Sequence, residues 1–392
     1  MRRCEMELVG RRFDTGEQVR LSIANGRVAA CEPTDSHSPR APWIAPGFVD
    51  LQVNGYGGQE LNDPALTPDG VERLVLGLDP FGVTQSCPTA TTHGFETLKH
   101  SLATVASAID SNPSVAQRVP GIHLEGPYIS PQDGPRGAHP LEHVRPPDWP
   151  EFQRLQEAAR GKIRILTMSP EYEESPNFIT RVVRSGVLVA IGHTAANSDQ
   201  IAAAIDAGAR MSTHLGNGAH GQIRRHPNYI WDQLADDRLT PSLIVDGHHL
   251  PPAVVKCFVR AKGTEHCVVV SDITGMAGMP PGRYDETSIG PVEVLEDGRL
   301  VVAGQRQYLA GAALPIHVAI PNLMSFAGLN LATAVLMATS QPAALIDARC
   351  GGFSVGSTAD FVLFELTDAP RAQLEIRATL NSGELVYGRV AT

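Results

Sequence analysis

The sequence has no paired cysteine motif, no long apolar run and no excess of basic residues. Its six cysteines are scattered without a Cys-x-x-Cys pair: Cys4, Cys31, Cys87, Cys257, Cys267 and Cys350. This spacing argues against a disulfide framework and predicts reduced thiols in a cytoplasmic protein. No stretch approaches the about 18 apolar residues of a membrane span. Met1-Arg2-Arg3 is not followed by an apolar region, so we expect no signal peptide.

The charge balance is acidic, and internal repeats and low-complexity segments are also missing. A formal net charge of -10 argues against nucleic acid as the main partner. It leaves room for a local basic pocket that binds an anionic substrate. What the chain does have is length and core-forming residues, with 392 residues of which 42% are hydrophobic. This is enough for one large barrel and a small accessory domain.

The middle of the chain alternates short apolar strands with amphipathic segments. Strands are predicted at residues 48–53, 82–87, 120–125, 163–168, 187–192, 210–214, 242–246 and 267–272. Strands that alternate with helices favour a parallel sheet, and their number favours an α/β fold of the (β/α)8, TIM-like barrel type. A hairpin with an Asp-Gly turn is expected within residues 285–304, inserted after the last strand.

Both ends of the chain show the period-two alternation of strands. Residues 5–31 alternate around an Asn25-Gly26 turn, and residues 360–364 and 385–387 repeat the pattern. We expect the two ends to meet in one small β-sandwich. It would consist of residues 1–43 and 346–392, while residues 44–345 form the barrel.

Four residues suited to metal binding or proton transfer stand at the ends of predicted barrel strands. Glu125 and Asp272 close the third and eighth strands, and His193 and His214 end the fifth and sixth. In such a barrel the carboxyl ends of the strands converge on one mouth. Two imidazoles and a carboxylate can hold zinc with a position left for water, and a further aspartate can serve as base. The sequence therefore predicts a metal-dependent hydrolase.

Loops after the barrel strands carry further candidates. Residues 136–139, 218–221 and 246–249 combine glycine with histidine, arginine or aspartate, and residues 224–227 hold two arginines and a histidine; all four segments are candidates for substrate contacts. Each polar side chain there can equally be a solvated loop residue. The small residues 309–313 are expected to begin a helix whose N-terminus faces the pocket.

The motifs together resemble those of a known family. The stretches are PGFVDLQVNGYGG (46–58), GIHLEGPYIS (121–130), RGAH (136–139), GHTAA (192–196), THLGN (213–217), DGHHL (246–250), VSDITGMAG (270–278) and LAG (309–311), with ADFVLFEL and NSGELVYG near the C-terminus. They resemble the N-acetylglucosamine-6-phosphate deacetylases of the amidohydrolase superfamily. The resemblance covers nearly the whole chain.

The resemblance implies one divalent metal per chain, held by Glu125, His193 and His214. Zinc is the first expectation, with iron, cobalt and manganese as alternatives. It also implies Asp272 as the catalytic acid and base, with His139 assisting the metal at the carbonyl oxygen.

The first barrel strand departs from the usual superfamily pattern. Many amidohydrolases carry His-x-His there, whereas this chain has Gln52-x-Asn54. Because amides are weak ligands for zinc, we expect no metal bond from this strand, and the resemblance points to the family branch with a single metal. We place Gln52 and Asn54 among the substrate-binding candidates.

The resemblance implies further substrate contacts around the mouth. These are Ala138, His139, Asn217, Gly218, Asp246, Gly247, His248, His249, Leu309, Ala310 and Gly311. Two departures concern this set. Gly216 stands where the family usually has an aromatic residue, and the family's phosphate-reading arginine matches Arg225, with Arg224 just before it, in altered surroundings.

The reaction expected is removal of the acetyl group from an N-acetylated amino sugar. The leading substrate is N-acetyl-D-glucosamine 6-phosphate, which would give glucosamine 6-phosphate and acetate. The alternative is an amidohydrolase that acts on another N-acetyl hexosamine, or on an N-acyl amino acid as a D-aminoacylase does. A non-catalytic scaffold is disfavoured because all four key positions are present. The family also implies a homodimer, and we expect neither a nucleic acid nor a membrane partner.

Overall fold

The computed structural model describes residues 6–34, 41–285, 287, 290–367 and 372–390. Eight parallel strands form a barrel in chain order: β5 (Phe48–Val53), β8 (Val83–Thr91), β9 (Ile122–Glu125), β10 (Ile163–Met168), β11 (Leu188–Ile191), β12 (Met211–Ser212), β13 (Thr240–Leu243) and β14 (Val268–Val269). The barrel closes where Val53 pairs in parallel with Ile273, just beyond β14. The predicted barrel and its strands are confirmed.

The barrel strands are buried on both faces, which explains their nearly continuous apolar sequence. Alternate residues such as Val49, Leu51 and Ile165 meet in a core that fills the barrel. Their neighbours, among them Phe48 and Leu166, belong to the larger core between strands and helices. This alternation follows from the period of two along a strand.

Helices cover the outside of the barrel. They are α1 (Pro68–Leu76), α2 (Phe95–Ser111), α3 (Pro113–Arg118), α4 (Trp149–Ala158), α5 (Ser175–Arg184), α6 (Ser198–Asp206), α7 (Tyr229–Ala235), α8 (Pro252–Lys262), α9 (Ala319–Ala327), α10 (Leu331–Leu336) and α11 (Ser340–Leu345), with 3-10 turns η1 (Asp79–Phe81), η2 (Leu141–His143), η3 (Thr264–His266) and η4 (Ile316–Val318). The start of α6 is fixed by a capping box between Asn197 and Gln200. Within the described residues, no helix combines the length and apolar character that a membrane span requires.

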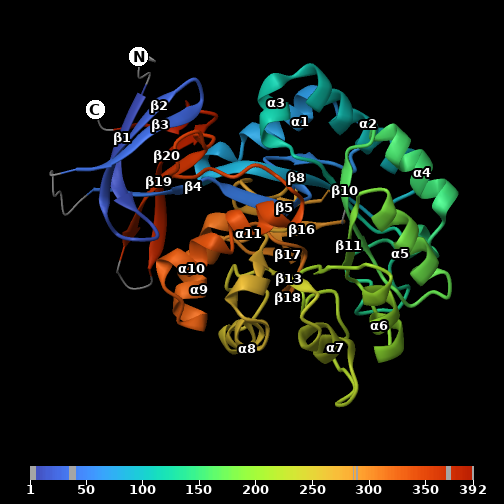
Figure 1. The fold of residues 1–392 in the computed structure, drawn as a ribbon. Helices are drawn as coiled ribbons and strands as arrows, with labels where there is room; N and C mark the ends of the chain where they lie inside the picture. The colour runs from blue at the N-terminus through green and yellow to red at the C-terminus, as the bar shows by residue number, and fades with distance from the viewer. Residues whose placement is uncertain (1–5, 35–40, 286, 288–289, 368–371, 391–392) are drawn as a thin grey trace.

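The two ends of the chain meet in one sheet at one end of the molecule (Figure 1). Its order is β21–β20–β19–β4–β1–β2–β3, with β1 (Met6–Arg12), β2 (Gln18–Ala24), β3 (Arg27–Pro33), β4 (Trp43–Pro46), β19 (Phe361–Thr367), β20 (Gln373–Asn381) and β21 (Glu384–Gly388). The sheet folds over a core of its own that includes Leu8, Leu21, Phe361 and Leu380. The turn between β2 and β3 lies against the turn between β20 and β21, where a Cβ on Gly26 would lie 2.6 Å from the Ser382 carbonyl oxygen.

The passage from this sheet to the barrel lies at Gly47. The boundary expected between residues 43 and 44 falls inside β4, which pairs with β1 and β19. The first barrel strand begins at Phe48. We therefore propose Gly47 as the domain boundary.

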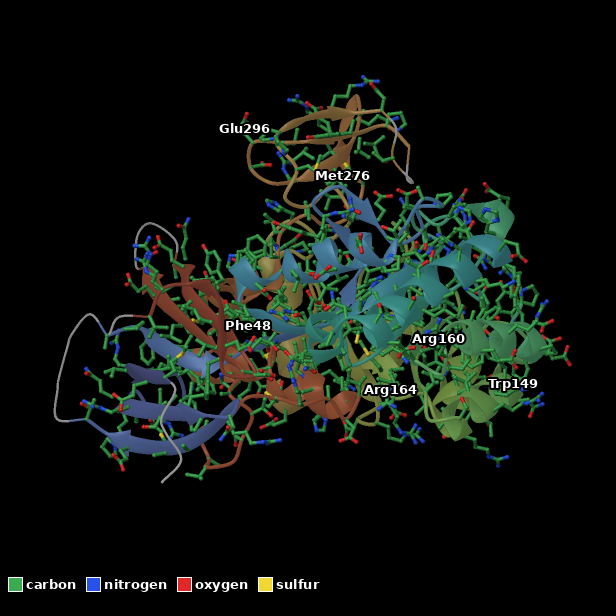
Figure 2. The ribbon with its side chains drawn as sticks, turned by 90° about the horizontal axis from the view of Figure 1, so that it is seen from above. Phe48, Trp149, Arg160, Arg164, Met276 and Glu296 are labelled. Carbon is green, nitrogen blue, oxygen red and sulfur yellow. The ribbon has the colours of Figure 1, made fainter. Side chains whose placement is uncertain are left out.

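A second antiparallel sheet follows β14 and stands out from the barrel, where Figure 2 labels Met276 and Glu296. It contains β15 (Gly282–Tyr284), β16 (Val292–Val294), β17 (Leu300–Val302) and β18 (Gln305–Leu309). The predicted hairpin is its central pair. A two-residue pair, β6 (Gly55–Tyr56) and β7 (Gln59–Glu60), lies beyond β5.

The helix expected at residues 309–313 is not formed, and that prediction was wrong. The chain leaves β18 extended, and Ala312 pairs in parallel with Ile273. Gly311 has a φ of 118°, which no α-helix contains. The small residues instead let this segment add to the closing edge of the barrel, and the next α-helix begins at Ala319.

Candidate active site

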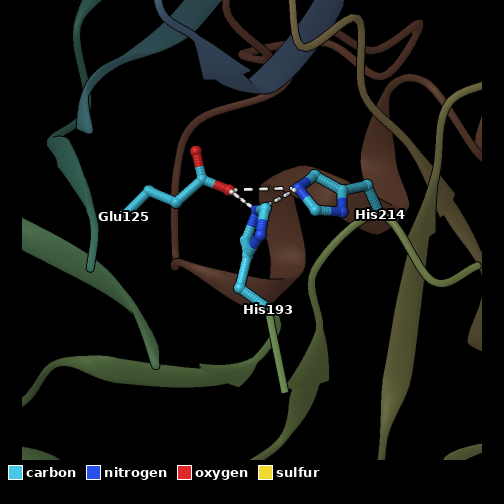
Figure 3. Close-up of side chains that lie close together, drawn as sticks. All are labelled: Glu125, His193 and His214. Atoms are coloured by element: carbon cyan, nitrogen blue, oxygen red, sulfur yellow. Dashed lines mark hydrogen bonds and ion pairs between the residues drawn. The ribbon is translucent and has the colours of Figure 1, made fainter. Parts of the chain in front are cut away.

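Glu125, His193 and His214 converge at the mouth of the barrel (Figure 3). Glu125 is the last residue of β9, and the two histidines lie two residues beyond β11 and β12. Glu125 Oε1 is 3.2 Å from His193 Nε2 and 3.1 Å from His214 Nε2. The two imidazole nitrogens are 3.1 Å apart. The structure thus brings the three expected ligands to one point.

These three donor atoms fit a divalent cation. Tetrahedral zinc, with bonds of about 2.0–2.1 Å, sets its ligand atoms about 3.3 Å apart, close to the separations found here. The exposed fractions of Glu125, His193 and His214 are 2%, 6% and 3%, so the three side chains are nearly fully buried. His193 Nδ1 lies 2.8 Å from the Pro135 carbonyl oxygen, to which it can donate. That bond leaves the Nε2 lone pair facing Glu125 and His214.

The backbone at the site adopts an uncommon conformation. His193, His214 and Asp272 have φ values of 50°, 28° and 56°. Such left-handed residues cost of order 1–3 kcal/mol each and concentrate at functional sites. Gly218 packs on the imidazole of His193, and a Cβ there would lie 2.7 Å from Nδ1. Glycine at this position therefore leaves the ligand ring its space.

The two amides of the first barrel strand hold carboxylates. Gln52 Nε2 donates to Glu125 Oε1 at 2.9 Å, and Asn54 Nδ2 donates to Asp272 Oδ1 at 2.7 Å. Gln52 is fully buried behind Glu125, away from the cavity lining, whereas Asn54 lines the cavity. Gln52 therefore orients Glu125, one of the three expected ligands, and does not line the cavity.

Asp272 and His139 are the groups available for acid–base and electrostatic work. Burial raises the pKa of Asp272 to about 6, which suits a group that takes and returns a proton near neutral pH. Burial lowers the pKa of His139 to about 3, so its ring is neutral. His139 Nε2 lies 3.2 Å from His193 Nε2, beside the ligand cluster.

A cavity of about 450 Å³ opens above these residues. It is lined by the three ligands, by Asp272, and by most of the expected substrate residues: Asn54, Ala138, His139, Asn217, Gly218, His249, Leu309, Ala310 and Gly311. Five expected residues do not line it: Gln52, Arg225, Asp246, Gly247 and His248.

Asp246 orients His249 and does not face the cavity. Its Oδ2 lies 2.7 Å from His249 Nδ1, and its Oδ1 accepts the backbone N–H groups of His248 and His249. Burial alone would raise the pKa of Asp246, but the hydrogen bond with His249 and the charge of that ring hold it at about 2. The carboxylate thus fixes one face of His249 and leaves the other to the cavity.

Arg225 lies outside the cavity of its own chain. It belongs to the exposed segment 221–227, which follows the cavity-lining residues Asn217 and Gly218 and which we call the rim segment. Arg224 lines a separate hollow of about 300 Å³ together with His220 and Tyr229. Neither arginine meets the catalytic groups within one chain.

The residues that line the cavity on the side of β8, opposite β11 and β12, were not predicted from the sequence. Residues on the β8 side that line the cavity are Thr89, Thr91, Thr92 and His93, with Leu61 and Asn62 from the segment after β7. The strand predicted at 82–87 stopped before Pro88, whereas β8 continues to Thr91. Proline inside a central strand normally argues against that strand. Here Pro88 pairs with Val53 beside an irregularity in the register between β5 and β8, so the strand continues through it.

The comparisons with known proteins agree with this geometry. The model of the amidohydrolase family matches residues 43–388. N-acetylgalactosamine-6-phosphate deacetylase of Escherichia coli O157:H7 is 34% identical, over 88% of this chain and 90% of that protein. N-acetylglucosamine-6-phosphate deacetylase of Bos taurus is 31% identical, over 88% and 83%. The crystal structure of N-acetyl-D-glucosamine-6-phosphate deacetylase from Mycobacterium smegmatis has a TM-score of 0.85 at 30% identity, over 98% of this chain and 100% of that one. The chain belongs to the amidohydrolase family and, within it, to the N-acetylhexosamine-6-phosphate deacetylases.

Proposed function

We propose that the protein is a metal-dependent deacetylase of a 6-phosphorylated N-acetylhexosamine. It would release acetate and the amino sugar phosphate. The observation that carries the proposal is the convergence of Glu125, His193 and His214 on one point, in a cavity that Asp272 also lines. We propose one divalent cation at this point, with zinc first because two imidazoles and a carboxylate suit it.

The identity of the sugar has two candidates. N-acetyl-D-glucosamine 6-phosphate is the leading one, on the resemblance of the motifs and on relatives such as the Bos taurus protein. N-acetyl-D-galactosamine 6-phosphate is the second, because the Escherichia coli and Shewanella relatives named for it are 34% and 33% identical to this chain. The two sugars differ only in the configuration at C4.

The chain's own residues account for the proton transfers. When bound, the cation would supply Lewis acidity that activates water and polarises the acetyl carbonyl. Asp272, held by Asn54 at 2.7 Å, accepts the proton of the attacking water. His139, whose neutral ring lies 3.2 Å from His193 Nε2, would donate a hydrogen bond to the carbonyl oxygen of the acetyl group. Asp272 then returns the proton to the amine nitrogen as the C–N bond breaks, which gives acetic acid and the free amine, and a proton passes from the acid to the amine or to solvent to leave acetate.

We propose further that the protein acts as a homodimer and that Arg225 binds the substrate phosphate of the neighbouring copy. Arg225 is exposed on a rim segment that does not line its own cavity. Ile223, in the same segment, and Trp231, in the first turn of α7, are 41% and 52% exposed and offer apolar surface for a second copy. Some members of the family complete their sugar-phosphate pocket across a dimer interface.

The experiment is a panel of substrates assayed by acetate release. It contains both N-acetylhexosamine 6-phosphates, the unphosphorylated sugars and N-acetyl-D-amino acids, with metal analysis of the purified protein. The proposal expects the phosphorylated sugars to react fastest. Faster release from N-acetyl-D-amino acids would instead establish the D-aminoacylase alternative.

A further inference from the structure

His193 depends on residues outside its own strand to keep its left-handed conformation. Its carbonyl oxygen accepts the backbone N–H of Ser130 at 2.9 Å. Its Nδ1 lies 2.8 Å from the Pro135 carbonyl oxygen. Both partners belong to the loop after β9, whereas His193 follows β11. The direction of Nε2 therefore depends on how this loop is held against the chain after β11.

One carboxylate, that of Glu171, joins the loops that follow three neighbouring strands. Its Oε1 accepts the Ser130 hydroxyl at 3.0 Å. Its Oε2 accepts the Ser169 hydroxyl at 2.8 Å and the Ala195 backbone N–H at 3.0 Å. Ser130 and Ser169 are completely buried. Two partners of Glu171 thus adjoin His193, since the Ser130 backbone N–H donates to its carbonyl group and Ala195 follows it by two residues.

The donors and acceptors of this hydrogen-bond network can be assigned, and they require an acceptor at position 171. Ser169 Oγ lies 2.8 Å from both Glu171 Oε2 and Thr194 Oγ1. A hydroxyl group has one hydrogen and a carboxylate can only accept. Ser169 therefore donates to Glu171 and accepts from Thr194, the residue next to His193. Glutamine has the size of glutamate but offers only one acceptor oxygen. With that oxygen kept for Ser169 and Ala195, its NH2 group would face Ser130 Oγ, so the buried Ser130 hydroxyl would lose its acceptor.

The main chain of Glu171 is fixed as well. Its carbonyl oxygen accepts Gln200 Nε2 at 2.9 Å. Gln200 belongs to the capping box that starts α6, directly after the His193 loop. Glu171 is absent from the lining of the cavity. Its contacts therefore reach the site only through neighbouring loops.

We propose that Glu171 is a positioning residue that directs His193 Nε2 toward the bound metal. The inference rests on the proposed function only through the metal site, and it is independent of the sugar. Outer partners of metal ligands typically contribute about 10–100-fold to metal affinity. Glu171 joins three loops at once, so its replacement should fall within this range.

The test measures zinc affinity by chelator competition on the full chain, starting from zinc-free protein. Glu171→Gln should bind zinc about 10–100-fold more weakly than wild type. Excess zinc should restore kcat, and KM should stay unchanged because Glu171 does not line the cavity. Glu173→Gln, the same change at an exposed position of the same loop, is the matched control and should bind zinc like wild type.

Ser130→Ala is the second variant, because it removes one donor to Glu171 and keeps the backbone bond to His193. It should weaken zinc binding about three- to tenfold, and it decides the question if Glu171→Gln does not fold. Unchanged zinc affinity in the folded variants, or equal weakening by Glu173→Gln, overturns the inference alone. A wild-type protein that binds no zinc or other divalent metal overturns the proposed function as well.

Discussion

The active-site cavity has a floor, where Glu125, His193 and His214 converge, and a rim that includes the exposed segment 221–227. The two hold their functional side chains in different ways. On the floor, Glu125, His193 and His214 are buried and bonded to partners from several strands. On the rim, Arg225 lies in a segment that is exposed throughout. Strand ends therefore fix the reaction, while the loops above them select the substrate. The same division explains how one barrel can serve many amide substrates.

The largest expected effect is on the floor, at a metal ligand. His193→Ala should lose bound metal and bring deacetylase activity down to the assay background, because only one imidazole and one carboxylate remain. Elemental analysis and acetate release measure the two outcomes. His266→Ala, which changes an exposed histidine in η3, is the control and should keep both metal and activity. Retained stoichiometric metal in His193→Ala would show that the ligands lie elsewhere.

The next effect separates proton transfer from metal binding. Asp272→Asn keeps the shape of the side chain but removes the base, so kcat should fall about 10²–10⁴-fold. Metal content should stay at the wild-type level, since Asp272 is not one of the three converging ligands. Steady-state kinetics with metal analysis checks this. Activity within a few-fold of wild type would assign the proton transfer to another group.

These floor residues could be predicted from the sequence because their signal is local. Each closes or directly follows an apolar run. Because strand ends converge in a parallel barrel, such residues are expected to meet at one site. Glu125 is the clearest case, since it ends β9 inside a fully buried strand. The chemistry of the four side chains predicted their roles, and the resemblance implied the same roles.

Other features could not be read this way because they depend on long-range packing. Gln52 has the sequence position of a substrate or metal contact, yet its hydrogen bond to Glu125 joins residues 73 positions apart. Residues 309–313 have helical composition, but their pairing with Ile273 makes them extended. In both places a contact between residues far apart in the sequence decides the outcome, and the local sequence does not reveal that contact. The three bonds to the Glu171 carboxylate likewise come from separate loops.

A smaller effect tests whether the floor depends on Gln52. Gln52→Leu removes the donor to Glu125 Oε1 while it fills a similar volume, so zinc affinity should fall about tenfold. Asn54→Leu is the matched comparison on the same strand. It should leave zinc affinity nearly unchanged and lower kcat, because Asn54 holds Asp272. Equal effects of both variants on zinc affinity would contradict separate roles for the two amides.

The smallest effect belongs to the rim and concerns only the phosphate. Arg225→Ala should raise KM for a 6-phosphorylated substrate roughly tenfold, the loss expected for a charge-assisted hydrogen bond. It should leave kcat and metal content unchanged, because Arg225 would contact only the phosphate and is not among the residues expected to hold the metal or transfer the proton. An unphosphorylated N-acetylhexosamine should show no change in KM, since its 6-hydroxyl gains little from a guanidinium.

Arg224→Ala is the control for Arg225, because the two arginines are adjacent and both exposed. If Arg225 binds phosphate in the site of the neighbouring copy, this can be tested by mixing two variants that are defective in different residues. Arg225→Ala chains combined with Asp272→Asn chains should then form one site with intact Asp272 and the neighbour's Arg225. A low KM recovered on mixing would place the arginine in the neighbouring copy. A mixture that keeps the high KM of Arg225→Ala would instead mean that each chain binds phosphate with its own rim, by a loop movement.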